Sequence, residues 1–184
     1  MHRETFHTFG GVVEPNSAPT LKSVAVSLCR ICRYCGNGEK WFPVGLHSMV
    51  VADLLPPHLK FHGLLHDEPE CCTNDIPHDL KTKWQRMFED TLLSRFYTSV
   101  GVKPPSLEEF KQIKKADYDA VHGEVWCGAG TKALRDKYDC MPEVEMITRR
   151  YMKEYSYADC LDSDGRAVKD FIRLFHLYKG LLKA

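Results

Sequence analysis

Three features are missing from this sequence, and each absence excludes a class of protein. No run of residues approaches the roughly 18 consecutive apolar positions that a membrane-spanning helix requires. The first residues, MHRET, lack the basic and then apolar layout of a secretory signal peptide. Net charge is also absent, because 25 Lys and Arg residues balance 25 Asp and Glu residues. We therefore expect a cytoplasmic protein (in the host cytoplasm if the source is viral) that binds neither a membrane nor a nucleic acid polymer.

The chain also lacks internal repeats, low-complexity segments and any convincing alternation of apolar and polar residues with the period of a β-strand. Its 184 residues, 43% of them apolar, are enough for one domain with a real core. Apolar residues recur at helical spacing instead, and Ser106 and Glu109 have the spacing of a helix capping box. We expect one all-α domain over residues 1–184, with an irregular lead-in over 1–19. Helices are predicted over about 21–34, 44–55, 58–66, 81–100, 106–127, 142–155 and 166–182.

The eight cysteines include a C-x-x-C-x-x-C pattern at Cys29, Cys32 and Cys35, which is typical of zinc or iron–sulfur sites. The first two fall within an apolar helical stretch, where cysteine behaves as a small core residue, and no later C-x-x-C partner exists. A cysteine-bound metal is therefore disfavoured, although Cys71-Cys72 offers two more thiols. In the cytoplasm we expect the cysteines to remain mostly reduced thiols.

A set of histidines and carboxylates predicts a different kind of metal site. His66-Asp67 lies where an apolar helix meets a bend, and adjacent helical residues can converge on one ion only near a helix end. His47 lies in the preceding predicted helix, and Asp117 lies among apolar neighbours in a later one. Two imidazoles and two carboxylates leave positions open for water, and an ion with an open position activates water for hydrolysis. An isolated His-Asp pair is more often a surface pair, so the prediction depends on all four residues.

Five segments, taken in order, resemble motifs of the HD superfamily of metal-dependent phosphohydrolases. They are CRYCG at 32–36, WFPVGLHS at 41–48, LLHDEPE at 64–70, DIPHDLK at 75–81 and KKAD at 114–117. More narrowly, they are similar to the 5′-deoxynucleotidase-like branch, which includes phage dATP triphosphohydrolases. The resemblance covers about residues 10–124 and implies that residues 1–184 form a single HD-domain helical bundle.

The resemblance also implies roles for individual residues. Glu70 resembles the catalytic carboxylate that orients or deprotonates the attacking water, and Asp75 resembles a second acid or base that helps the leaving oxygen depart. Without the motif, both would be interpreted as solvated residues of a polar bend. Four residues resemble the ligands of a divalent ion, expected to be Co²⁺, Mn²⁺, Zn²⁺ or Mg²⁺: His47, His66, Asp67 and Asp117.

A net-neutral protein must hold an anionic substrate with a local group of cations. Arg33, Lys81 and Lys114 each fall within or beside a motif, and Arg33 can donate two hydrogen bonds to one phosphate group. By the resemblance, Arg33 and the ring of Tyr34 flank the nucleotide. The family often has Trp or Phe at the second of these positions, so Tyr34 leaves stacking possible and the base preference open. A solvated helix face is the commoner role of a single lysine.

The sequence therefore predicts an enzyme that hydrolyses a deoxynucleotide phosphate with the help of a divalent metal ion. Triphosphates (for a dNTP triphosphohydrolase such as a dATPase) and monophosphates (for a 5′-deoxynucleotidase) both remain candidate substrates, and the two lysines slightly favour the longer phosphate. The alternative is a catalytically inactive HD fold used as a nucleotide sensor or partner-binding module. Loss of a metal ligand or of Glu70 would favour that alternative, and none is lost.

We also expect a homo-oligomer. The apolar face of the predicted helix over 166–182 is a candidate interface, although core packing is the commoner role of such a face.

Overall fold

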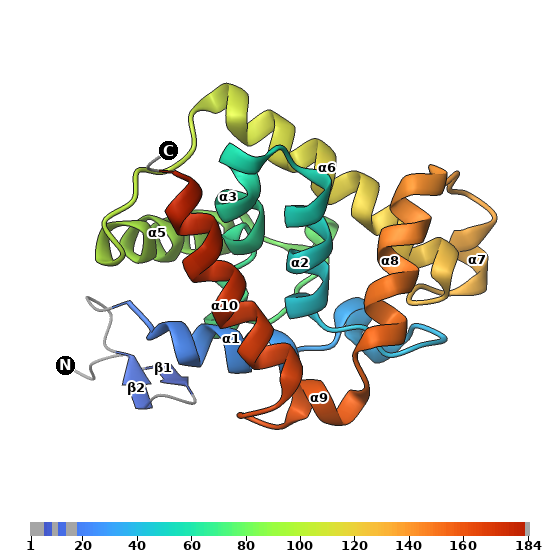
Figure 1. Ribbon diagram of the computed structural model, residues 1–184, viewed down its shortest axis with the longest axis horizontal. Helices are drawn as coiled ribbons and strands as arrows, with labels where there is room; N and C mark the ends of the chain where they lie inside the picture. Colours follow the sequence, from blue (N-terminus) through green and yellow to red (C-terminus); the bar gives the residue numbers. More distant parts are fainter. Residues whose placement is uncertain (1–5, 9–10, 14–17, 183–184) are drawn as a thin grey trace.

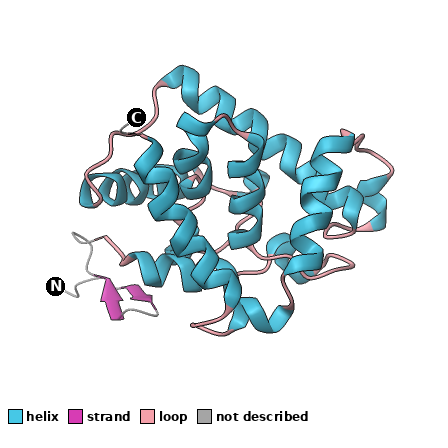
Figure 2. Ribbon diagram, in the orientation of Figure 1, coloured by secondary structure: helices cyan, strands magenta, loops and turns pink. Residues whose placement is uncertain are grey.

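The computed structural model describes residues 6–8, 11–13 and 18–182, and it confirms an all-α fold (Figure 1). Within these residues the chain forms ten α-helices, three short 3₁₀ helices and one two-stranded antiparallel hairpin (Figure 2). The α-helices are α1 (Leu21–Arg30), α2 (Val44–Leu54), α3 (Lys60–Leu65), α4 (Glu70–Thr73), α5 (Lys83–Ser99), α6 (Leu107–Cys127), α7 (Lys132–Arg135), α8 (Pro142–Glu154), α9 (Tyr157–Leu161) and α10 (Arg166–Leu181). The other elements are η1 (Arg33–Gly36), η2 (Pro57–Leu59), η3 (His78–Leu80), β1 (Phe6–Thr8) and β2 (Gly11–Val13).

Helix α2 lies at the centre of the bundle because almost all of its side chains are apolar. Every residue from Val44 to Ala52 is buried, and α2 contacts α1, α3, α6, α8 and α10. A helix without a polar face is stable in water only when neighbouring elements surround it. Figure 1 shows α2 and α3 near the middle of the molecule, with α8 to one side and α10 to the other. Residues carried by α2, including His47, are therefore held in the interior. In the described part of the chain, no helix combines the length and apolar character needed to cross a membrane.

Gly45 allows α1 and α2 to approach closely, because a Cβ atom there would lie 2.7 Å from the sulfur and 3.0 Å from the amide nitrogen of Cys29. Gly45→Ala should lower the free energy of unfolding by about 1–3 kcal/mol through overpacking, despite the better helix propensity of alanine. Gly180→Ala on α10 is the matched control, since nothing lies within 4 Å of the added methyl group. The control should be neutral or stabilising by up to about 1 kcal/mol. Urea denaturation measures both, and equal midpoints for the two variants would contradict the prediction.

Helix α1 ends at Arg30, before the predicted end near residue 34. The backbone N–H of Arg33 donates to the carbonyl of Phe42 at 3.0 Å instead of continuing the helix. Tyr34 and Cys35 then adopt left-handed backbone conformations, with φ of 57° and 53°. The helix is thus ended by contact with a distant segment, which a local pattern does not reveal. The C-x-x-C-x-x-C pattern consequently spans a helix and a turn, and all eight cysteines are free thiols.

The other differences from the expected elements are short segments. Helices α4, α7 and α9 were not predicted, although Ser156 and Asp159 form a capping box at the start of α9. The strands β1 and β2 fall within the predicted irregular lead-in over 1–19, part of which lies outside the described residues. Strands of three residues are too short to show an alternating pattern. The apolar face of α10 packs into the core through its buried residues, so core packing is its role: Phe171, Leu174, Phe175 and Tyr178.

Candidate metal centre

Three helices bring the four predicted metal ligands together. His47 lies on α2, His66 ends α3 and is followed by Asp67, and Asp117 lies on α6. The Nε2 atoms of His47 and His66 are 3.2 Å apart. Oδ2 of Asp67 lies 3.5 Å from Nε2 of His47 and 3.2 Å from Nε2 of His66. Oδ1 of Asp117 lies 3.1 Å and 3.6 Å from the same two nitrogens. Residues far apart in the sequence therefore meet around one point.

These separations suit the coordination of a single ion. Donor atoms about 2.1 Å from a common ion lie about 3.0 Å apart along an octahedral edge and about 3.4 Å apart along a tetrahedral edge. His47, His66 and Asp67 form a group that could hold a metal ion, and Asp117 offers a further oxygen to both histidines. His47 is fully buried, and the side chains of His66 and Asp67 are only 5% and 15% exposed. The donor atoms are thus largely shielded from bulk water.

Glu124 is a site residue to which the sequence reasoning gave no role. Its fully buried carboxylate accepts hydrogen bonds from Nδ1 of His47, from Nε of Arg33 at 2.9 Å and from the hydroxyl of Tyr34 at 2.8 Å. With the proton on Nδ1, the lone pair on Nε2 of His47 faces the other ligands, as metal binding requires. Burial raises the pKa of Glu124, but the charges of Arg33 and His47 outweigh this and lower it. The available signal was spacing, because a residue two helical turns after Asp117 lies on the same face of α6.

A backbone group orients His66 in the same way. Nδ1 of His66 donates to the carbonyl oxygen of Gly63 at 2.8 Å, which leaves Nε2 toward the site. Burial lowers the pKa of His66, yet the carboxylates of Asp67 and Asp117 outweigh burial and raise it to about 10. Burial also raises the pKa of each carboxyl group, but the two histidines hold the pKa values of Asp67 and Asp117 well below the usual range. The buried carboxylates thus stabilise positive charge between them, from a proton or from a metal ion.

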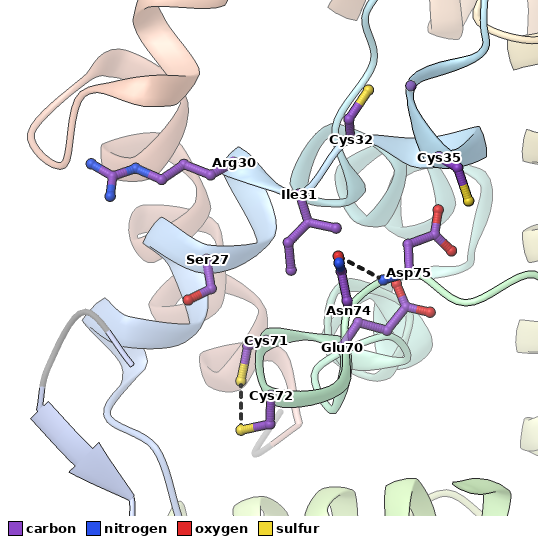
Figure 3. Close-up of a pocket in the computed structure, with 11 residues that line it drawn as sticks. Ser27, Arg30, Ile31, Cys32, Cys35, Glu70, Cys71, Cys72, Asn74 and Asp75 are labelled. Carbon is purple, nitrogen blue, oxygen red and sulfur yellow. Dashed lines mark hydrogen bonds between the residues drawn. The ribbon is translucent and has the colours of Figure 1, made fainter. Parts of the chain in front are cut away.

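The two predicted acid–base residues lie beside this centre. Glu70 begins α4 and is 5% exposed; its Oε1 accepts from Nζ of Lys81 at 3.2 Å. Its Oε2 is buried and has no hydrogen-bond partner among the described residues. Burial, followed by the charges of Asp67 and Asp75, raises the pKa of Glu70 well above its ordinary value. Burial likewise raises the pKa of Asp75. Figure 3 shows both side chains at the wall of a neighbouring cavity.

Arg33 and Tyr34 contact the candidate metal centre through Glu124, so the Nε–H group of Arg33 is not available to a phosphate. Nε of Arg33 and the hydroxyl of Tyr34 are both hydrogen-bonded to Glu124. Nη1 of Arg33 lies 3.7 Å from Oδ2 of Asp67, and the side chain is 10% exposed. Both residues still line the cavity beside the metal centre. Their contact with a substrate stays a prediction.

Lys81 and Lys114 also line this cavity, but each amine already pairs with a carboxylate. Nζ of Lys81 lies 3.2 Å from Glu70 and 3.0 Å from Glu89, and its side chain is 13% exposed. Nζ of Lys114 lies 2.9 Å from Oδ2 of Asp117, and its side chain is 50% exposed. Asp117 belongs to the same KKAD segment as Lys114, whereas Glu89 lies outside all of the motifs. The free positive charge at the site is therefore smaller than the sequence indicated.

A cavity of about 300 Å³ lies beside the metal centre. Eight predicted site residues line it: Arg33, Tyr34, Asp67, Glu70, Asp75, Lys81, Lys114 and Asp117. His66 lines an adjoining cavity of about 290 Å³. A larger cavity of about 780 Å³ shares Glu70 and Asp75 with the first (Figure 3). Glu70 and Asp75, the predicted acid–base residues, thus lie at the boundary between the candidate metal centre and the largest of these three cavities.

Comparison with known proteins shows a partial likeness. No protein-family model matches the chain. A segment of 61 residues is 36% identical to the protein YfdR of Escherichia coli strain K12, which is described as uncharacterized. The match covers 33% of this chain and 34% of YfdR, so it spans about a third of the length of that relative. The chain is similar to YfdR over this segment, and no activity follows from that likeness.

Proposed function

We propose that the chain is a divalent-metal-dependent phosphohydrolase that acts on deoxynucleotides, as its HD-like motifs imply. The observation that carries the proposal is the meeting of two imidazole nitrogens with two carboxylate oxygens, at 3.1 to 3.6 Å, beside a cavity lined by acids and cations. This donor set suits Co²⁺, Mn²⁺, Zn²⁺ or Mg²⁺ and leaves positions for water. The ligands proposed are His47, His66, Asp67 and Asp117.

When bound, the ion would lower the pKa of a water molecule and polarise a phosphoryl oxygen. Glu70 is proposed to accept the proton of the attacking water through Oε2, to which no described group donates a hydrogen bond. Its raised pKa suits this role, because a general base works best when its pKa is near the working pH. Asp75, whose pKa is also raised, is proposed to donate a proton to the leaving oxygen. Arg33, Lys81 and Lys114 are proposed to bind the phosphate oxygens.

The pairing of the lysines bears on the length of the phosphate chain. Two unpaired lysines would favour a triphosphate, but Lys81 and Lys114 are each balanced by a carboxylate. The site therefore has no excess positive charge that would favour a triphosphate over a monophosphate. The proposal covers both a dNTP triphosphohydrolase and a 5′-deoxynucleotidase.

A product assay tests the proposal and separates these two activities. The protein is stripped of metal with a chelator, reloaded separately with Co²⁺, Mn²⁺, Zn²⁺ or Mg²⁺, and incubated with each dNMP and each dNTP. We expect phosphate release with at least one metal and none from the stripped protein. Orthophosphate from dNMPs would identify a 5′-deoxynucleotidase, and triphosphate from dNTPs a triphosphohydrolase. Nucleotide binding without phosphate release in any metal would instead support a catalytically inactive sensor.

Glu70→Gln should lower kcat by about 10²–10⁴-fold while the protein still binds metal, because the amide cannot accept the proton. Since the base must be ionised and its pKa is raised, wild-type activity should fall on acidification at a pH above the ordinary carboxyl range. The variant should lack this acid limb. Its matched control is Glu89→Gln, which removes the other carboxylate on Lys81 and should reduce kcat far less. A pH series of kcat with metal analysis checks this, and an unchanged acid limb in Glu70→Gln would exclude the role.

A further inference from the structure

A separate cavity of about 490 Å³ lies between the loop that precedes α2, the end of α6 and helix α8. None of its lining residues lines the cavity beside the metal centre. Figure 1 shows α8 next to the C-terminal half of α6, and the two helices are in contact. The cavity is therefore distinct from the candidate active site and has its own set of side chains.

Positive charge is concentrated around this cavity. Three cations line it, namely Lys40, Arg149 and Lys153, and no carboxylate does. Among the described residues, Lys153 has no hydrogen bond or ion pair, and Nζ of Lys40 donates only to the carbonyl of Cys127 at 3.0 Å. Nε of Arg149 pairs with Glu145 at 2.7 Å, and the other two guanidinium nitrogens of Arg149 can still donate to a ligand. In a chain of zero formal net charge, this group of cations is a local concentration of positive charge.

Two aromatic rings with fixed orientations line the same cavity. The indole of Trp41 packs edge-to-face on Tyr157, with ring centroids 4.8 Å apart. The ring of Tyr155 stacks on Tyr151 at 5.9 Å, the guanidinium of Arg166 lies over it at 5.1 Å, and its hydroxyl donates to Asp170 at 2.9 Å, so Tyr155 forms a fixed wall of the cavity. Rings held in this way offer a flat surface to a planar ligand at little cost in conformational freedom. Planar bases stack on such rings with about 1–3 kcal/mol each.

We propose that this cavity is a second nucleotide-binding site, in addition to the candidate active site. The phosphates would bind Lys153, Arg149 and Lys40, and the base would stack against Trp41. A nucleotide is the ligand class that combines a planar aromatic group with several negative charges, and a cavity of about 490 Å³ has room for one. The proposal goes beyond phosphate hydrolysis and does not depend on it.

Fluorescence of Trp41 tests the proposal directly. The chain has three tryptophans, and Trp84 and Trp126 are 67% and 39% exposed. Trp84→Phe with Trp126→Phe therefore leaves Trp41 as the single reporter. This protein is titrated with dATP in the presence of a chelator, so that no divalent ion occupies the metal centre. We expect saturable quenching of Trp41, unchanged by Asp67→Ala, which separates this site from the proposed active site.

Charge and aromatic variants test the two halves of the site. Lys153→Ala should weaken dATP binding by about tenfold or more, as expected for the loss of a charge-assisted contact. The control Lys169→Ala, on an exposed position of α10, should not change it. Deoxyadenosine alone and tripolyphosphate alone should each bind more weakly than dATP. The assignment is overturned if no saturable quenching occurs, if Lys153→Ala matches Lys169→Ala, or if either fragment binds as tightly as dATP. Calorimetric titration of the chain with all three tryptophans gives an independent measurement.

Discussion

Asp67→Ala should remove stoichiometric metal binding and lower kcat/KM by at least about a thousandfold. Oδ2 of Asp67 lies within hydrogen-bonding or ion-pairing range of both ligand nitrogens, at 3.5 Å from His47 and 3.2 Å from His66. Its loss removes a proposed ligand and a negative charge that would stabilise a cation between the histidines. A bound ion contributes several kcal/mol of transition-state stabilisation, and about 4 kcal/mol corresponds to a factor of about 10³.

The matched control for this variant is Asp79→Ala. Asp79 belongs to the same acidic bend, but its side chain is fully exposed and pairs only with exposed His78. The control should keep the wild-type metal content and activity. Metal analysis after dialysis and a phosphate-release assay measure both quantities. If Asp67→Ala retained one ion per chain and normal turnover, the metal centre would lie elsewhere.

Glu124→Ala should have the largest effect on stability of any single change at the site. It removes the acceptor shared by His47, Arg33 and Tyr34 and leaves the buried Arg33 guanidinium with only the 3.7 Å contact to Asp67. Breaking a buried ion pair in this way typically destabilises by about 3–5 kcal/mol. Because Glu124 also fixes the tautomer of His47, metal affinity should fall by about 10–100-fold.

Urea denaturation of the metal-free protein measures the change in the free energy of unfolding. Glu108→Ala, on the same helix, is the control: its side chain is 74% exposed and pairs only with Lys111. The control should change the free energy of unfolding by less than about 0.5 kcal/mol. Glu124→Gln, which keeps the shape and loses the charge, allows metal affinity to be measured if the alanine variant does not fold. Equal urea midpoints for Glu124→Ala and Glu108→Ala would contradict the assigned role.

Helices were predictable where an apolar pattern and an end signal coincide. Helix α6 begins at the Ser106 capping box and ends at Gly128 in the left-handed conformation. The helical spacing of apolar residues in α5 also predicts one buried face, but only part of it is covered. Phe96 is buried, whereas Trp84 is 67% exposed. Spacing shows which side chains share a face, and only tertiary packing decides whether another element covers that face.

The sequence indicated residues that the fold brings close together, but it did not indicate which of them pair with one another. The ordered motifs indicated a site, and the fold brings eight of the predicted residues to one cavity, while His66 lines an adjoining cavity and His47 is buried beside it. The roles of these residues stay predictions. Glu124 was missed because its partners belong to α2 and to the segment after α1, and nothing local links it to them. The pairing of Lys81 with Glu89 was missed for the same reason, because no motif links the two residues.

The complete burial of α2 also bears on the rate at which an ion could enter or leave. Amides of a helix surrounded on all sides should exchange with deuterated solvent only when the whole bundle opens. The bend after Asp67 is different, because Asn74 and residues 77–80 are exposed and should open locally. His47 should thus belong to the slowest-exchanging part of the chain, and the exposed positions between Asn74 and Leu80, a few residues after Asp67, to a faster one. The rate of ion exchange should therefore be set by local opening of the bend. A substitution that stabilises the bend should slow metal loss more than one that stabilises the core.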